Sequence, residues 1–163
     1  EVTTALKGRS VQIDYVITNR DEKPMPFSFG LPPAFALSDP NSAKIRFPRA
    51  EHHVLIPAAE TILTMDDAFI EQHKTFLLSH PQSPYVDLIQ PDYTVRVSCA
   101  GYRWLAFWKK SQAKFICIEP WMGKCDSGET TTDFYAREGT IVLQPNTAYA
   151  IGYTITLLDK NVC

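Results

Sequence analysis

The sequence has no long apolar run, no excess of basic residues and few cysteines. Its apolar runs are short, as in the segment from Phe115 to Ile118, whereas a membrane-spanning helix needs about 20 apolar residues. The formal net charge of -2 disfavours a nucleic-acid-binding surface, because such surfaces carry clustered basic residues. No basic stretch followed by an apolar one opens the chain, so no secretory signal is visible. We therefore expect a cytoplasmic protein that binds neither nucleic acid nor a membrane.

The four cysteines also lack the spacing of a metal site. They stand at positions 99, 117, 125 and 163, with no C-x-x-C pair and no histidine at the spacing of a zinc knuckle. Cys99 and Cys117 fall in strand-like segments, where a free cysteine commonly packs as a small hydrophobic side chain. Reduced thiols in a cytoplasmic protein are thus favoured over a disulfide scaffold, and we expect no bound metal.

Alternating apolar and polar residues dominate the sequence. Segments 11–18, 93–100 and 149–157 place apolar side chains at every second position, which is typical of half-buried antiparallel strands. The 12 prolines leave little room for helices, and only residues 65–73 fit a short one. The 163 residues, 45% of them hydrophobic, therefore predict a single all-β domain over residues 1–163, an antiparallel sandwich or a barrel. Further strands are expected at residues 45–47, 53–56, 75–79, 85–89, 104–108, 115–119 and 140–143.

The segment Phe115-Ile-Cys-Ile-Glu-Pro-Trp-Met-Gly-Lys-Cys-Asp126 carries the clearest chemical signal. Pro120 cannot donate to a sheet ladder, so it marks either the end of the strand or an edge of the sheet. We therefore expect Glu119 to lie where the strand meets a loop. A carboxylate in partly apolar surroundings has a raised pKa and can act as a general base near neutral pH. The indole of Trp121 beside it is suited to stacking on a sugar ring. The alternative, a surface acid beside a core tryptophan, is equally compatible with the spacing.

This segment resembles the "C-I-E-P-W-x-G-x-x-D" block of the aldose 1-epimerase (galactose mutarotase) family, in its LacX-like branch. Residues 26–35, Pro-Phe-Ser-Phe-Gly-Leu-Pro-Pro-Ala-Phe, are similar to the family's "p-F-s-x-G-x-H-P-a-F" block. Residues 104–108, Trp-Leu-Ala-Phe-Trp, resemble its "l-a-i-W" strand, and residues 138–155 resemble its closing strands. The resemblance covers nearly the whole chain, which corresponds to the C-terminal half of the family's fold.

The resemblance implies a β-supersandwich fold and the interconversion of the α and β anomers of a sugar without metal or organic cofactor. In the family a glutamate takes the proton of the anomeric hydroxyl while a histidine protonates the ring oxygen. Glu119 matches the glutamate, and Trp121, Phe35 and Trp108 are the expected sugar-facing aromatic side chains. The sugar-contacting aspartate of the family falls on Lys74, which could bind an oxyanion or a phosphate group. A small-molecule sugar is therefore the expected partner.

The sequence departs from the family at its general acid. The family histidine falls on Pro32, which has no titratable group, and His52 or His53 is the least unfavourable substitute. The family's N-terminal half is also missing, so we expect the chain to associate with a copy of itself or with such a half. Three hypotheses follow: a mutarotase with weakened activity, a catalytically silent sugar-binding or interaction protein, and an unrelated sandwich. Agreement of several blocks in order disfavours the last.

Overall fold

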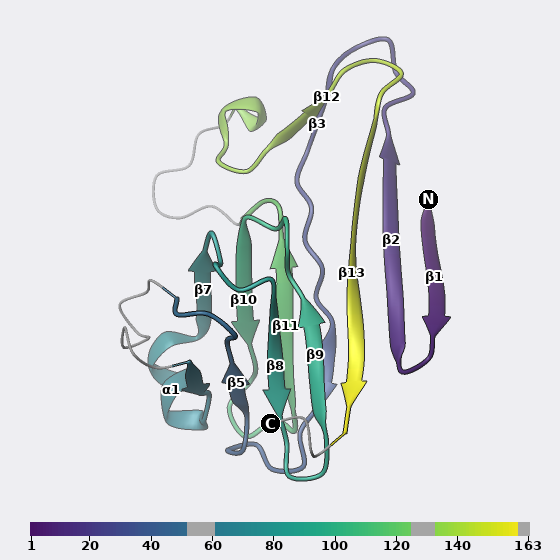
Figure 1. The fold of residues 1–163 in the computed structure, drawn as a ribbon. Coiled ribbons are helices and arrows are strands. Elements are labelled where there is room, and N and C mark those ends of the chain that lie inside the picture. Colours follow the sequence, from purple (N-terminus) through teal and green to yellow (C-terminus); the bar gives the residue numbers. More distant parts are fainter. Residues whose placement is uncertain (52–60, 125–132, 160–163) are drawn as a thin grey trace.

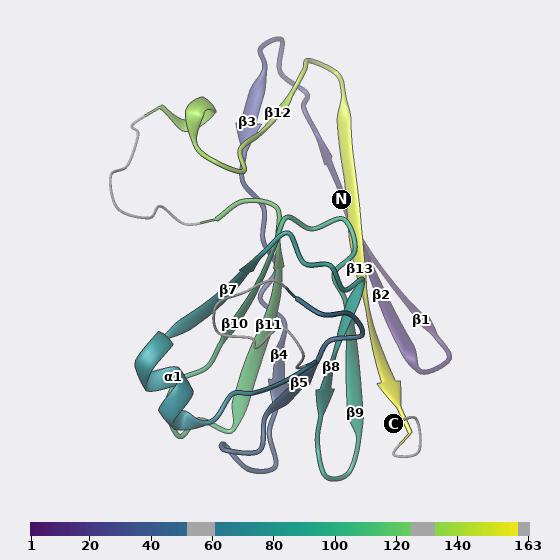
Figure 2. The same cartoon turned by 60° about the vertical axis from the view of Figure 1, so that its left-hand side comes forward.

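Two antiparallel sheets pack against each other and form the body of the protein (Figures 1 and 2). The computed structural model describes residues 1–51, 61–124 and 133–159. The larger sheet has seven strands in the order β1-β2-β13-β9-β8-β5-β6. These strands are β1 (Val2–Lys7), β2 (Ser10–Thr18), β13 (Ala148–Leu158), β9 (Thr94–Ser98), β8 (Tyr85–Ile89), β5 (Lys44–Arg46) and β6 (Ile62–Thr64).

The smaller sheet has four strands in the order β4-β11-β10-β7. They are β4 (Ala34–Ala36), β11 (Phe115–Trp121), β10 (Trp104–Trp108) and β7 (Thr75–Ser79). The short helix α1 (Asp67–His73) leads directly into β7, and Asp66 caps its first turn by accepting from the N–H of Phe69. A third pair, β3 (Met25–Phe27) with β12 (Ile141–Leu143), lies at one end of the molecule near the 3₁₀ turn Phe134–Ala136 (Figure 1).

One hydrophobic core fills the space between the two large sheets. The smaller sheet contributes every second side chain of its strands, including Phe107 on β10 and Ile116 and Ile118 on β11, each 0% exposed. The larger sheet contributes Val86 and Val97 from the facing strands β8 and β9. Strict alternation on β11 therefore turns Cys117, Glu119 and Trp121 to the opposite face of the smaller sheet. The fold thus presents these three side chains away from the core.

The all-β prediction is confirmed, and most predicted strands match within about a residue or two of their observed ends. The predicted helix at 65–73 is α1. The short strands β3, β4 and β6 and the N-terminal β1 were not predicted, and the strand expected at 53–56 lies outside the described residues. Both described cysteines, Cys99 and Cys117, are buried free thiols.

Pro120 does not end its strand, so the first of the two readings of this proline is wrong. β11 continues to Trp121, and Pro120 pairs with Leu105 of β10. The N–H groups of Ile118 and Met122 both donate away from β10, to the carbonyls of Pro33 and Phe29. The N–H that Pro120 lacks would point the same way, so its absence removes a bond only on that side and leaves the ladder to β10 intact. Glu119 is consequently a mid-strand residue.

Candidate functional site

The candidate site is centred on Glu119, whose carboxylate is held by side chains of its own strand. Oε2 of Glu119 accepts a hydrogen bond of 3.1 Å from the indole Nε1 of Trp121. Cys117 stands two residues before Glu119, so its thiol lies on the same face of β11. Burial raises the pKa of Glu119 above its ordinary value, and the hydrogen bonds from Trp121 and Cys117 oppose this shift. A half-buried carboxylate with a raised pKa is a suitable general base.

Pro32 lies directly across from Glu119 in the neighbouring segment. The backbone pairs of β11 with residues 29–36 follow one register, from Phe115 opposite Ala36 to Trp121 opposite Gly30. On one side of Glu119, the N–H of Ile118 donates to the carbonyl of Pro33. On the other side, the N–H of Leu31 donates to the carbonyl of Pro120. Glu119 and Pro32 therefore form a non-hydrogen-bonded pair, in which Cα atoms lie about 4.5 Å apart and side chains share one face. The position that matches the family histidine thus faces the carboxylate but carries no proton donor.

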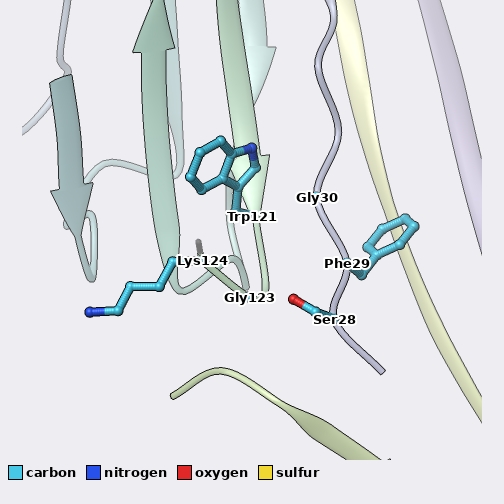
Figure 3. Close-up of a pocket in the computed structure, with 6 residues that line it drawn as sticks. All are labelled: Ser28, Phe29, Gly30, Trp121, Gly123 and Lys124. Carbon is cyan, nitrogen blue, oxygen red and sulfur yellow. The ribbon is translucent and has the colours of Figure 1, made fainter. Parts of the chain in front are cut away.

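Trp121 forms one wall of an open pocket of about 350 Å³ (Figure 3). The pocket is lined by Ser28, Phe29, Gly30, Trp121, Gly123 and Lys124. A Cβ atom on Gly30 would lie 2.7 Å from Cδ1 of Trp121, so the missing side chain is what lets the indole stand beside this segment. Phe29 turns away from the indole, and its ring packs edge-on against Tyr15. Glu119 does not line this pocket but binds the nitrogen of the indole that does.

Aromatic side chains stand at both ends of the sheet face that carries Glu119. Trp104 of β10 lies opposite Trp121, and Trp108 lies opposite Cys117. Trp104 is 1% exposed, whereas Trp108 is 39% exposed and contacts the ring of Phe115. Between these aromatic residues, Ala106 of β10 pairs with Glu119. Trp108 and Trp121 therefore share a face with Glu119, as a sugar-facing pair would require.

Phe35 and Lys74 are not brought to this face. Phe35 pairs with Ile116, so alternation turns its ring to the core, where it packs. Lys74 caps the end of α1, three residues before Leu77. Leu77 of β7 and Glu119 of β11 both pair with Ala106 of β10, so β7 lies two strands from β11. Spacings of about 3.3 Å per residue and 4.8 Å per strand put the Cα of Lys74 roughly 14 Å from that of Glu119. The structure thus separates both residues from the carboxylate.

The histidines give no proton donor at Glu119 in the part of the chain that the structure describes. His52 and His53 lie outside the described residues. His73 is at the end of α1, where its ring contacts Phe69. His80 has φ 51° just after β7, and its ring lies 6.3 Å from that of Trp104. Pro32 and Ala106, the cross-strand neighbours of Glu119, cannot donate a proton from their side chains.

Sequence reasoning missed the glycines that shape the pocket. A Cβ atom on Gly123 would lie 1.8 Å from Oγ of Ser28, and one on Gly139 would lie 2.7 Å from the Trp104 ring and 2.8 Å from Cα of Gly123. Lys124 was also missed. It pairs with Glu138, and its ammonium lies 5.8 Å from the centre of the Trp104 ring. Gly30 and Gly123 both stand in the blocks that carry the family resemblance, which was the available signal.

Comparison with solved structures identifies the fold. A galactose mutarotase-like protein from Lactobacillus casei ATCC 334 is 22% identical, with 96% of this chain and 62% of that chain covered and a TM-score of 0.84. A galactose mutarotase related enzyme from Lactobacillus acidophilus is 16% identical, with 99% and 61% covered and a TM-score of 0.84. A candidate aldose 1-epimerase from Escherichia coli K12 is 15% identical, with 97% and 59% covered and a TM-score of 0.65.

The chain therefore has the galactose mutarotase-like fold, an all-β sandwich of antiparallel sheets. It spans about three fifths of the length of these proteins. No family model matches the sequence, and no curated protein matches it either. The assignment to the LacX-like branch and to the C-terminal half of the fold stays a prediction.

Within residues 1–51, 61–124 and 133–159, no helix has the length and apolar character needed to cross a membrane. The same ranges contain no group of three or more His, Cys, Asp or Glu side chains placed to hold a metal ion.

Proposed function

We propose that this protein interconverts the α and β anomers of a hexose by acid–base ring opening, at a rate lowered by the loss of the general acid. The supporting observation is the half-buried Glu119 carboxylate with its raised pKa, fixed by the Trp121 indole. No ion pair joins Glu119 to a cation among the described residues, so its charge is free to attract the proton of a substrate hydroxyl. Neither a metal nor an organic cofactor enters this reaction.

Glu119 would remove the proton from the anomeric hydroxyl as the bond from C1 to the ring oxygen breaks. The open-chain aldehyde rotates about its C1–C2 bond, and ring closure on the other carbonyl face gives the other anomer. The ring oxygen must gain a proton as the ring opens and lose it on closure. Pro32 cannot supply this proton, so water takes the role of the acid. Loss of a positioned acid typically costs about 10²–10⁴-fold in rate.

Trp121 and Trp108 are the proposed sugar-contacting residues. Both lie on the Glu119 face, and Trp121 also lines the pocket with an accessible side chain. An indole face packs on the C–H groups of a pyranose, which leaves the hydroxyl groups to polar partners such as Glu119. Phe35 has no place in this proposal because its ring packs in the core.

The second candidate function is sugar binding without catalysis. The observation that favours it is the pairing of Glu119 with Pro32, which leaves the base without a partner acid. Binding and catalysis separate here because Trp121 and Trp108 do not need a proton donor to contact a sugar. A ligand-dependent change in tryptophan fluorescence without mutarotation would favour this second function.

Polarimetry on freshly dissolved α-glucose or α-galactose tests the proposal directly. The unmodified chain should exceed the spontaneous rate, Glu119→Gln should return to it, and Glu22→Gln at an exposed turn should leave the activity unchanged. Pro32→His places an imidazole opposite the carboxylate, and because Pro32 is exposed the ring has room. We expect this variant to be faster than the unmodified chain. Equal, spontaneous rates for the unmodified chain and Glu119→Gln would reject the enzyme in favour of sugar binding.

A further inference from the structure

Three alternating residues of β11 form a chain of side-chain contacts along one face. Cys117, Glu119 and Trp121 stand two residues apart, so they point the same way and lie close enough for side chains to meet. Glu119 accepts the indole N–H of Trp121 from one side along the strand, and Cys117 flanks it on the other side. The carboxylate thus lies between two potential donors of its own strand.

The neighbouring strands offer Glu119 no polar side chain. Across one edge of β11 its partner is Pro32, and across the other edge it is Ala106 of β10. On the next strand, β7, the residue level with it is Leu77. These three side chains neither titrate nor hydrogen-bond. The contacts along β11 therefore have no competitor from the strands beside it.

Among the described residues, Lys124 and His80 lie at the Trp104 end of this face and make contacts there. Lys124 pairs with Glu138 and lies over the Trp104 ring, and His80 packs near the same ring. Lys74 lies at the far end of β7, beside α1. The acidity of the carboxyl group consequently depends on its burial and on two donors, Trp121 and Cys117.

The indole itself is held in place by Gly30. Because a Cβ atom there would lie 2.7 Å from Cδ1 of Trp121, the ring packs directly on the backbone of the facing segment. Its N–H is therefore fixed toward Glu119 before any ligand arrives. The thiol is likewise fixed as a donor, because burial and the charge of Glu119 raise the pKa of Cys117 to about 11. It stays protonated at neutral pH.

We propose that Cys117 and Trp121 are positioning residues that together orient the Glu119 carboxylate and stabilise its ionised form. This inference rests on the proposed function for its catalytic meaning, but the hydrogen-bonded arrangement exists without it. Trp121 then has two separable roles, since its ring faces the pocket while its N–H holds the base. Trp121→Phe keeps an aromatic ring and removes only the donor.

The experiment measures the pKa of Glu119 itself by carbon-13 NMR of its side-chain carboxyl, assigned by its loss in Glu119→Gln. Trp121→Phe and Cys117→Ala each remove one donor, so each should raise the pKa of Glu119 because the carboxylate loses a hydrogen bond. Cys117→Ser keeps a donor at the same place and should stay near the value of the unmodified protein. An unchanged pKa in both Trp121→Phe and Cys117→Ala would overturn the proposal.

The pair Cys117→Ala and Cys117→Ser keeps the test decisive if Trp121→Phe fails to fold. Equal pKa values in these two variants would also overturn the role of the thiol, since only one of them retains a donor. Near-ultraviolet circular dichroism checks that each variant is folded before its titration is compared.

Kinetics separate failure of this inference from failure of the proposed function. If the protein is a mutarotase, the acid limb of kcat/KM against pH should move upward in Trp121→Phe and Cys117→Ala but not in Cys117→Ser. When the pKa of Glu119 rises by one unit, the fraction of Glu119 that is ionised falls about tenfold at any pH below that pKa. Absence of mutarotation together with the expected NMR shifts would reject the function and retain the positioning. Mutarotation with a pH profile that none of the variants moves would reject the positioning and retain the function.

Discussion

Gly30 and Trp121 are in such close contact that a single methyl group between them would collide with the indole. An added Cβ atom would lie 2.7 Å from Cδ1, 3.1 Å from Cγ and 3.2 Å from Nε1 of Trp121. The two residues also form a backbone bridge, so the segment cannot shift without disturbing β11. The orientation of the indole therefore depends on a residue that has no side chain.

We predict that Gly30→Ala displaces the Trp121 indole and lowers the free energy of unfolding by about 1–3 kcal/mol, as overpacking does. Urea unfolding measures the loss, and a changed tryptophan emission of the folded protein reports the moved ring. Gly8→Ala is the matched control, because a Cβ atom there meets nothing within 4 Å while its φ of 59° is strained. The control should lose stability without altering the emission. An unchanged emission in Gly30→Ala would contradict the prediction.

The raised pKa of Glu119 predicts how stability depends on pH. Below the ordinary glutamate pKa of about 4.3, the group is protonated in both the folded and the unfolded chain and has no effect. As the pH rises above that value, the unfolded chain ionises first, which favours unfolding. Glu119→Gln removes this contribution. The stability of Glu119→Gln relative to the unmodified protein should therefore increase from pH 4 to pH 7.

Urea unfolding of the two proteins at several pH values checks this sign, because all other titrating groups are shared. Exposed Glu22→Gln serves as the control and should show no such trend. A stability difference that is constant with pH, or that turns in favour of the unmodified protein as the pH rises, would show that the folded-state pKa of Glu119 is not raised.

Local patterns predicted the long strands β2 and β13 but missed β1 and three of the five strands that have only three residues. β2 and β13 span 9 and 11 residues, enough for alternation to be recognised. β3, β4 and β6 have three residues each, too few for alternation to distinguish them from a loop. Local sequence does not separate the two readings of Pro120, because the direction in which its missing N–H would point depends on which strand lies on each side. The identity of the flanking strands is set by the tertiary structure and cannot be read from the local sequence.

The same limit decides which of the predicted site residues share a face in the structure. Glu119, Trp121 and Trp108 share a face because β10 and β11 are adjacent regular strands, whose alternation is readable from the sequence. Phe35 comes soon after a pair of prolines. The face of the sheet to which its side chain points depends on the register between this segment and β11, and the segment has little alternation of its own. Lys74 was assigned by a loose alignment, and helix α1 displaces it from the strand face. The contact of Gly30 with Trp121 joins residues 91 positions apart, beyond any local pattern.

A buried carboxylate on the larger sheet gives a prediction independent of the candidate site. The side chain of Asp87 on β8 is 2% exposed, and it accepts from Arg46 at 2.9 Å and from Arg96 at 2.8 and 3.1 Å. Asp87→Ala leaves two guanidinium groups without this partner, and removing one member of a buried ion pair costs about 3–5 kcal/mol. Asp159→Ala, which breaks an exposed pair with Arg9, should cost at most about 1 kcal/mol. Urea unfolding of both variants measures the difference, and equal losses would contradict it.

The outer strand β1 leads to the last prediction, which concerns self-association. β1 pairs only with β2, so its other edge has unpaired backbone groups among the described residues. Val2 and Leu6 on this strand are 60% and 78% exposed, and both lie on one face with Thr4 between them. An exposed apolar edge strand is a template for pairing with another chain. We therefore expect the protein to form homo-oligomers, or to bind a separately supplied N-terminal half of the fold.

Light scattering over a range of protein concentrations tests this expectation. Leu6→Lys places a charge on the exposed edge and should shift the protein toward the monomer, because a buried unpaired ammonium opposes pairing. Lys110→Ala, an exposed change in the turn between β10 and β11, is the control and should leave the mass distribution as it was. If the unmodified chain stays monomeric at high concentration and does not bind an added N-terminal half, the edge of β1 is not an interface. If instead Leu6→Lys associates as strongly as the unmodified chain, the oligomer forms through another surface.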